Sequence, residues 1–468
     1  MSPEPARTRA RRGVAMIVAL VMTTILVCLA TALISVSMLE LRKGGNLQQI
    51  TRAQLAAESG LAYTLRALRD VRLPSETPPE ALAAGLYAAL SAKLSPPPVL
   101  SASAGGMATL TVPAVDLSPG SFTCTLTLDP GPVPPVCRLR VEGTSGDVSR
   151  WVATQLLFVR KRSVIFNHGI ASRGKIVIQG SAHVEGVTHP SDASILSTCD
   201  EPVAIEAGGH ATVDGDLYIT GDSVSAIVLT GGGLSIGGAS DIDEIFDHHV
   251  HMGTTDPQFP PTDTSAFAAL ATNVIDGNTD LSGTTSFSNI RIKAGTDPVF
   301  SSNTVLSGVV YVEAPNKVQF SGQVTIKGVL ATQDGSGHPL GDCQLTFTGN
   351  VSAPGVSALS DAPEYTEVKK LTGTVVLAPG FATSFKGSSN GFNGVVAADQ
   401  VSFLGSSGIL GEVTGTIVGL KNKDMILSGN ASIRIRGSSD STPPTGFIQP
   451  WGLDLVPGSY TEPIAGQE

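Results

Sequence analysis

The most marked feature of the sequence is an apolar run close to its beginning. Residues 14–38 contain no charged side chain, and as a helix rising about 1.5 Å per residue they reach about 37 Å, enough to span a bilayer. This run is longer than the apolar core of about 7–15 residues in a secretory signal peptide. Several arginines precede it and only Glu4 opposes them. The positive-inside rule therefore predicts one transmembrane helix with a cytoplasmic N-terminus and a body beyond the membrane.

The helical pattern continues beyond the apolar run. Apolar residues recur up to Leu73 at mostly three- and four-residue steps, the pattern of an amphipathic helix. They are Leu47, Ile50, Ala57, Leu61, Leu65 and Leu68. Gly44 and Gly45 interrupt this pattern at a cost of about 1 kcal/mol each, so we expect a kink or break there. Pro74 ends the helix, which we predict over residues 14–73.

Residues 74–163 have a mixed pattern. A helical periodicity over 79–94 is followed by four runs in which apolar and polar residues alternate, as in half-buried strands. The runs are 107–115, 121–128, 137–144 and 150–159. This pattern predicts a small α+β region.

The five cysteines lie apart in the chain, and no two form a C-x-x-C pair. Their spacing argues against a zinc site and, outside the cytoplasm, leaves disulfides as their natural use. Cys124 and Cys137 flank a proline-rich turn between two strand-like runs, so a disulfide across a hairpin is a possible pairing. Cys199 and Cys343 can pair only if the fold brings them together, which the sequence leaves open.

A repeat replaces the helical pattern beyond residue 163. An apolar residue, any residue and then Gly or Ser recur at steps near twenty, with longer steps that can hold loops. The apolar members in the second half are Phe300, Phe320, Phe347, Phe385, Phe403 and Leu427. A glycine follows eight positions after both Phe300 and Phe320, which indicates that the structure repeats as well.

Such a period suits a right-handed parallel β-helix over residues 164–440, in which each coil buries its apolar face by stacking on the next. Glycine suits the corners, where the chain turns with positive φ. We therefore predict that Phe320, Phe347, Phe385 and Phe403 are buried and stacked along one side. The alternative is a β-sandwich, whose strands recur every 8–12 residues. In either case the fold class is mainly β.

The first seventy residues also carry a family resemblance. RRGVAMIVALV at 11–21 and LELRKGGNLQQITRAQLAAESGLAYTLRALR at 39–69 resemble the N-terminal region of PilX-type minor pilins of type IV pili. The region, about residues 9–72, is also similar to the large tip pseudopilin of type II secretion. The resemblance implies that a prepilin peptidase cuts between Gly13 and Val14, that the new N-terminus is methylated, and that the apolar helix packs among other pilin or pseudopilin subunits.

The resemblance also implies a location and a role. It places the protein in the bacterial inner membrane, with its body in the periplasm or in a surface pilus. Major pilins have a glutamate at the fifth mature position, where this chain has Val18, so an initiating or tip role fits better than a repeated subunit. The sequence leaves open whether the leader is cleaved and whether the system is a pilus or a secretion system. The alternative is a plain signal anchor that tethers an exported domain.

Charge and motifs narrow the function further. A net charge of −10 and a pI near 5.3 argue against nucleic acid as a partner. No glycine-rich nucleotide-binding loop precedes a predicted helix. Carboxylates that could act on glycans lie beside glycines in turn-like contexts; they are Glu185, Asp214, Asp216 and Asp222. We therefore expect no enzyme and no cofactor, and a role in assembly, at a tip or in adhesion. The alternative is a membrane-anchored β-helix protein that binds or cleaves glycans.

One stretch, residues 241–268, breaks the repeat and is predicted to be a loop insertion. It is rich in side chains that could bind a divalent metal. They are Asp241, Asp243, Glu244, Asp247, His248, His249 and His251. Their spacing matches no defined metal motif, so an ordinary polar loop without metal is the expectation, and metal binding is the alternative.

The last residues, 441–468, are rich in proline and apolar side chains. We expect them to cap the last coil of the β-helix, with Trp451, Leu453 and Leu455 as contacts, because an open coil presents unpaired strand edges. A tail that docks a partner is the alternative. The predicted organisation is a basic leader at 1–13, the helix at 14–73, the α+β region at 74–163, the β-helix at 164–440 and this tail.

Overall fold

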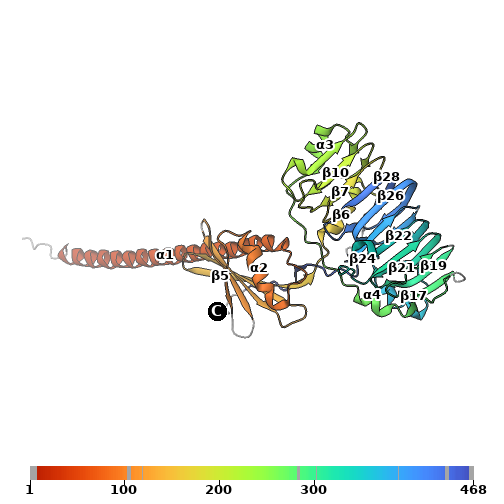
Figure 1. Cartoon of the computed structure of the whole chain (residues 1–468). Coiled ribbons are helices and arrows are strands. Elements are labelled where there is room, and N and C mark those ends of the chain that lie inside the picture. The colour runs from red at the N-terminus through yellow and green to blue at the C-terminus, as the bar shows by residue number, and fades with distance from the viewer. Residues whose placement is uncertain are drawn as a thin grey trace, which may run out of the picture. The chain divides into compact units, whose positions relative to one another are not determined.

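The computed structural model describes residues 8–102, 107–118, 120–281, 285–301, 303–387, 389–437 and 442–462. The chain divides into two compact units (Figure 1). The first comprises residues 1–73, 77–159 and 452–468, and the second comprises 74–76 and 160–451. The second unit is therefore an insertion in the chain of the first.

The first unit begins with α1, one uninterrupted helix from Thr8 to Arg69. The expected break at Gly44 and Gly45 is wrong, because both lie inside the helix with nothing within 4 Å of where a Cβ would stand. A cost of about 1 kcal/mol per glycine is small against the cooperativity of so long a helix. Between Met16 and Arg69 the helix contains an apolar stretch of mean hydropathy 2.7, long enough to cross a membrane.

The second half of α1 packs on a six-stranded sheet with the strand order β1-β2-β3-β4-β5-β29. The elements are α2 (Leu82–Ser91), β1 (Val99–Ala102), β2 (Ala108–Leu117), β3 (Gly120–Asp129), β4 (Val136–Ser145), β5 (Val148–Arg160) and β29 (Trp451–Leu455). Small residues of the helix, Ala53, Ala56 and Ala57, are buried. A side chain at Gly143 of β4 would overlap the carbonyl oxygen of Ala53, so glycine permits the close approach of helix and sheet.

The cysteine pair of this sheet does not meet. In the antiparallel register of β3 and β4, Cys124 lies opposite Val141 and Cys137 opposite Leu128. Four positions along a strand are about 13 Å, beyond the roughly 7 Å between Cα atoms that a disulfide tolerates. Both are free, buried thiols, and the predicted disulfide is wrong. Cys199 and Cys343 are free as well.

The second unit is a parallel β-helix. Its first three coils consist of short strands: β6 (Ile170–Ser172), β7 (Ile176–Ile178), β8 (His183–Gly186), β9 (Ile195–Ser197), β10 (Ile205–Gly208), β11 (Thr212–Val213), β12 (Leu217–Ile219), β13 (Ile227–Thr230) and β14 (Ser235–Ile236). Strands at the same corner of successive coils pair in parallel, as β7 does with β10 and β10 with β13. After α3 (Ile242–His248), the strand β15 (Val250–His251) pairs with β12. The right-handed sense of the coil stays a prediction.

The remaining coils form a longer stack that follows α4 (Ser265–Leu270). Its strands are β16 (Asn273–Ile275), β17 (Ser286–Ile292), β18 (Val299–Phe300), β19 (Thr304–Val312), β20 (Asn316–Phe320), β21 (Gln323–Thr332), β22 (Cys343–Phe347), β23 (Asn350–Ala353), β24 (Thr374–Phe385), β25 (Ser389–Asn393), β26 (Val395–Thr414), β27 (Ile417–Gly419) and β28 (Met425–Arg436). These strands also pair in parallel, as β20 does with β22.

The coils are not stacked in the order of the sequence. The last coil pairs with the first, β27 with β6 and β28 with both β7 and β8, all in parallel. Figure 1 shows the result, with β6 and β7 between β10 on one side and β28 and β26 on the other. Residues 241–268, predicted as a loop insertion, therefore contain α3 and β15, which still belong to the coils. They also contain the first part of the connection that leads from β15 at one end of the solenoid to β16 at the other.

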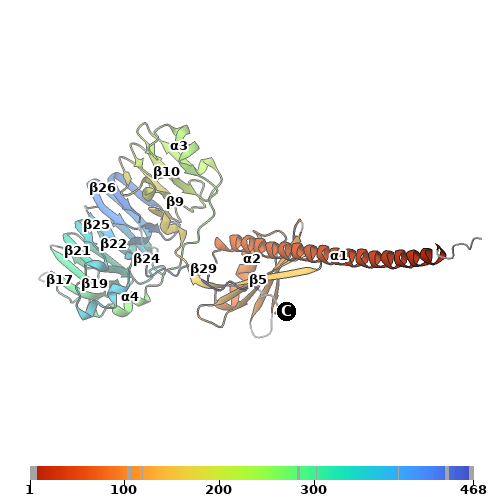
Figure 2. The same ribbon diagram turned by 180° about the vertical axis from the view of Figure 1, so that it is seen from behind.

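The same pairing explains why the tail does not cap the last coil. The strand edges of that coil are already bonded to the first coil. The strand β29, which contains Trp451, Leu453 and Leu455, instead lies beside β5 in the sheet of the first unit (Figure 2). The predicted capping contacts are therefore wrong.

A column of phenylalanines fills the solenoid as predicted. Phe300, Phe320, Phe347, Phe385 and Phe403 are buried and pair in register from coil to coil. Their ring centroids are 5.6, 4.8, 4.8 and 4.9 Å apart in that order, with the planes within 11° of parallel. One continuous parallel column excludes the alternative β-sandwich, in which facing sheets interdigitate.

Candidate functional site

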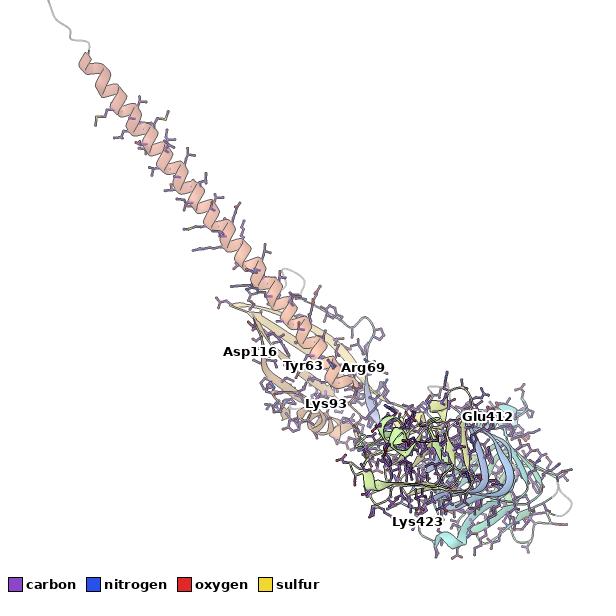
Figure 3. All side chains as sticks on the ribbon, turned by 90° about the horizontal axis from the view of Figure 1, so that it is seen from above. Tyr63, Arg69, Lys93, Asp116, Glu412 and Lys423 are labelled. Carbon is purple, nitrogen blue, oxygen red and sulfur yellow. The ribbon has the colours of Figure 1, made fainter. Side chains whose placement is uncertain are left out.

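Two parts of the molecule carry candidate functional residues, and the first is the apolar half of α1. Every Leu, Ile, Val and Met from Met16 to Leu47 exposes at least 49% of its surface. Figure 3 shows these side chains standing out from the helix on its stretch beyond the sheet, whereas Tyr63 lies where helix and sheet pack together. An apolar surface of this extent marks contact with a membrane or with other apolar helices.

Four hydroxyl groups in this stretch, those of Thr23, Thr24, Thr31 and Ser35, donate to carbonyl oxygens of the same helix. Thr24 donates to the carbonyl oxygen of Leu20 at 2.7 Å, and Ser35 donates to that of Thr31 at 2.8 Å. Thr31 bonds in the same way to Val27 at 2.9 Å. In hydrocarbon an unbonded polar group costs several kcal/mol, so these internal bonds suit the helix to an apolar environment.

The predicted cleavage site lies at the beginning of the same helix. Gly13 and Val14 belong to α1. The structure describes the backbone at these two positions but not their side chains. Val18, the fifth residue counted from the predicted cleavage site, is 54% exposed. Cleavage between Gly13 and Val14 stays a prediction.

The second part is a groove of about 580 Å³ on the solenoid, at the corner that precedes β6, β9 and β12. The structure brings two of the four predicted carboxylates, Asp214 and Asp216, into its lining. The other two lie elsewhere: Glu185 forms an ion pair with Arg434 at 3.1 Å, and Asp222 is not part of the lining.

Asp216 is held between two imidazole rings. Its Oδ1 lies 2.8 Å from Nδ1 of His249, and its Oδ2 lies 3.0 Å from Nε2 of His251. Burial acts to raise the pKa of Asp216, but the hydrogen bonds to the two histidines outweigh it and leave the pKa below its usual value. The carboxylate is therefore ionised at neutral pH.

Aromatic rings continue the cluster. The ring of Tyr218 stacks on that of His251 with the centroids 4.5 Å apart, and His168 meets Tyr218 edge-on at 5.0 Å. Burial lowers the pKa of His168 to about 4, so this ring is neutral near pH 7. Burial, and after it the charge of Asp216, raises the pKa of the Tyr218 hydroxyl.

From the sequence, the acidic residues of 241–247 are only possible metal ligands, and an ordinary polar stretch is the expectation. Asp241 instead caps α3, since its Oδ1 accepts hydrogen bonds from the backbone of Asp243 and Glu244 at 3.0 and 3.1 Å. Negative charge in the first turn also complements the helix dipole. Within the described ranges, no group of three or more His, Cys, Asp or Glu side chains is arranged to hold a metal ion.

The contact of Asp216 with His249 and His251 was not predicted from the sequence. The strands β12 and β15 pair Leu217 with Val250, so the residues just before each strand also lie side by side. The repeat of the coils is the sequence pattern that could have predicted this contact. The segment of α3, which precedes β15, interrupts that repeat, so the alignment of β12 with β15 cannot be read from the sequence.

The comparisons with known proteins give a family match to the N-terminal region and a likeness to a solved structure. No curated protein matches the sequence. The crystal structure of the competence-associated pilin ComZ from Thermus thermophilus is similar at 12% sequence identity and a TM-score of 0.29, over 89% of this chain and 97% of that chain. Residues 12–62 match the PilX N-terminal family. The resemblance predicted from the sequence is thereby confirmed, and most of α1 is similar to the PilX N-terminal family.

Proposed function

We propose that this protein is a minor pilin or pseudopilin of a type IV pilus or of a type II secretion-like system. The observation that carries the proposal is the division of α1. The match to the PilX N-terminal family covers residues 12–62 of this helix. The first half of α1 leaves its apolar side chains exposed, while the second half packs on the sheet of its own unit. The first half is thus available to lipid and to the helices of other subunits.

The size of the exposed apolar surface supports this role. Seventeen Leu, Ile, Val and Met side chains are exposed between Met16 and Leu47. Full burial of such a side chain is worth about 1.5–3 kcal/mol, so the stretch as a whole gains on the order of 30 kcal/mol or more in an apolar environment. That gain suits first the inner membrane and then the core of a filament.

The proposal includes processing and a position in the assembly. A prepilin peptidase removes the basic leader between Gly13 and Val14, and the new N-terminus is methylated. With Val18 at the fifth mature position, the chain has no carboxylate for the terminal amine of a neighbouring subunit. We infer a place at the tip or at the initiation of the assembly, with the solenoid in the periplasm or at the surface.

The solenoid is proposed to serve as an exported module for assembly or adhesion, without enzymatic activity. It is inserted between β5 and β29, neighbouring strands of the sheet, which suits a module added to a pilin body. The carboxylates considered for glycan chemistry have structural partners: Glu185 binds Arg434, and Asp214 accepts a hydrogen bond from the backbone of Gly186 at 3.1 Å.

The proposal is tested by expressing the full chain with and without a prepilin peptidase and sequencing the mature N-terminus. We expect a new N-terminus at Val14 that depends on the peptidase and is lost in Gly13→Ala. Gly44→Ala is the matched control, because it makes the same change at an open position of the same helix. An intact leader in the presence of an active peptidase overturns the proposal and leaves a plain membrane anchor.

A further inference from the structure

The outer face of the solenoid carries a row of residues that the parallel pairing aligns from coil to coil. Successive side chains of a strand point to opposite faces, so the neighbours of this row, such as Val310 and Val312, belong to the interior. The row consists of Tyr311, Ala331, Leu377, Ala397, Val418, Ala171, Leu196, Tyr218 and His251. From Tyr311 to Leu196 it is buried in an apolar cluster that also includes residues of 259–271 and 356–371. The chain therefore covers this face itself as far as Leu196.

The last two members of the row differ from the others. Tyr218 and His251 are aromatic and only half-buried, and their rings stack with the centroids 4.5 Å apart. The side chain of His251 is 41% exposed. Asp216 holds this pair in place, because it bonds to His251 at 3.0 Å and to His249 at 2.8 Å. Rings that are fixed before a ligand arrives lose little conformational entropy on binding.

Tyr218 also lines the groove of about 580 Å³. The lining residues come from the corners before β6, β9, β12 and β15, which are four successive coils. Parallel strands lie about 4.8 Å apart, so the groove runs about 14 Å along the solenoid. This coil repeat is close to the length of one unit in an extended chain of hexoses.

The polar groups of the groove suit hydroxyl groups of a ligand. Asp192 and Asp214 use their Oδ2 atoms for backbone amides, whereas their Oδ1 atoms form no hydrogen bond with other described residues and can accept one from a ligand. Asn167 and Ser191 add further donors and acceptors. The described lining contains no Lys or Arg, so a phosphate or a carboxylate of a ligand would find no cation there.

We propose that this groove binds an uncharged, linear polysaccharide, with one sugar ring against the aromatic surface of Tyr218 and His251. The apolar C–H face of a sugar ring fits an aromatic surface, and its hydroxyl groups reach the polar lining. An ammonium group fits less well, because every carboxylate of the groove already has a polar partner. The inference rests on the proposed role of the solenoid in adhesion and names the class of its ligand.

The charge of this region argues against the other common ligand of aromatic surfaces. Bases of single-stranded nucleic acids also stack on aromatic rings, but such sites carry positive charge for the phosphates. Between Lys175 and Arg291 the chain has sixteen Asp or Glu and no Lys or Arg. This part of the solenoid therefore repels a nucleic acid and any acidic polysaccharide.

The test uses the full chain in a detergent without a sugar head group and isothermal titration calorimetry. Cellohexaose and the hexamer of N-acetylglucosamine are the probes, and we expect at least one to bind with a Kd below about 1 mM. Binding should be the same at low and at high salt, because the ligand is uncharged. Tyr218→Ala should weaken it about tenfold, since a stacked ring is lost, whereas Tyr218→Phe should stay within about twofold.

Tyr87→Ala is the matched control, because it makes the same change at a 37% exposed tyrosine on α2, and it should leave binding unchanged. If Tyr218→Ala does not fold, Tyr218→Leu decides, because it keeps an apolar side chain but loses the ring. The proposal is overturned if neither hexamer binds, if Tyr218→Leu binds as well as the unchanged protein, or if only oligogalacturonate or the glucosamine hexamer binds.

The two proposals fail separately. Glycan binding does not depend on processing of the leader, so absence of binding leaves the pilin role of α1 in place. An intact leader in the cleavage experiment likewise leaves a positive titration valid.

Discussion

Phe347 lies at the middle of the column of stacked rings and is 2% exposed. Its ring stacks on Phe320 and on Phe385 at 4.8 Å each, and it meets Phe392 edge-on at 6.1 Å. Truncation of a buried phenylalanine to alanine costs about 3–5 kcal/mol, and each aromatic pair adds about 0.5–1.5 kcal/mol beyond burial. Because Phe347→Ala loses three ring contacts, we expect a loss of about 5 kcal/mol, at the upper end of the range.

The assay must report on the solenoid alone, since a chain of two units does not unfold in one step. Hydrogen exchange followed by mass spectrometry in increasing denaturant gives the unfolding free energy for peptides of β20, β22 and β24. Phe347→Leu should cost less than about 1.5 kcal/mol, and Val274→Ala, at a 53% exposed position, should stay within about 0.5 kcal/mol. A loss below about 1 kcal/mol for Phe347→Ala would refute the column as a source of stability.

The remaining predictions concern glycine, pH and the insertion. Gly328 has φ 138°, and a side chain there would overlap the carbonyl oxygen of Gly308. Gly328→Ala should therefore destabilise the solenoid by more than about 1 kcal/mol in the same exchange assay. An equal loss of stability in Gly328→Ala and in Gly337→Ala, which is at an open position, would contradict this. Burial lowers the pKa of His168 to about 4 in the folded protein. The free energy of unfolding is therefore fully retained above the unfolded pKa of about 6.5 and falls by up to about 3 kcal/mol as the pH drops towards 4. Denaturation midpoints measured against pH should lose this slope in His168→Asn, and an unchanged slope would count against the prediction. Replacement of residues 161–450 by a short Gly-Ser link should leave the sheet folded, because the two residues to be joined already lie close together, with Arg160 over the ring of Trp451 at 3.7 Å. A cooperative loss of the β-sheet circular dichroism signal on heating would support this prediction, and aggregation of the shortened protein would contradict it.

The sequence predicted those parts of the fold that repeat locally. A triplet with an apolar residue recurs once per coil, as at Phe320, Phe347 and Phe385, so the pattern indicated both burial and stacking. The stacking of the last coil on the first was not predictable, because β28 and β7 pair over more than two hundred residues without a local signal. Parallel pairing of this kind depends on the whole solenoid and not on the residues of either strand.

The errors have similar physical causes. Proximity in sequence suggested that Cys124 and Cys137 meet, but the register of the hairpin pairs Asp129 with Val136 and shifts the two thiols apart. The acidic residues near His249 drew attention as possible ligands, whereas the contact that forms comes from Asp216 in the preceding coil. In both cases strand register, which the sequence specifies only through the whole sheet, decides which side chains meet.

The N-terminal residue of the protein in purified extracellular filaments tests the central claim most directly. The protein is produced in cells with a pilus or type II secretion-like system, filaments are sheared off and purified, and this chain is identified and sequenced from its N-terminus by mass spectrometry. The account predicts a small amount of protein relative to the main subunit, beginning with methylated Val14. Protein that is found only in the membrane fraction, with residues 1–13 still attached, would contradict it.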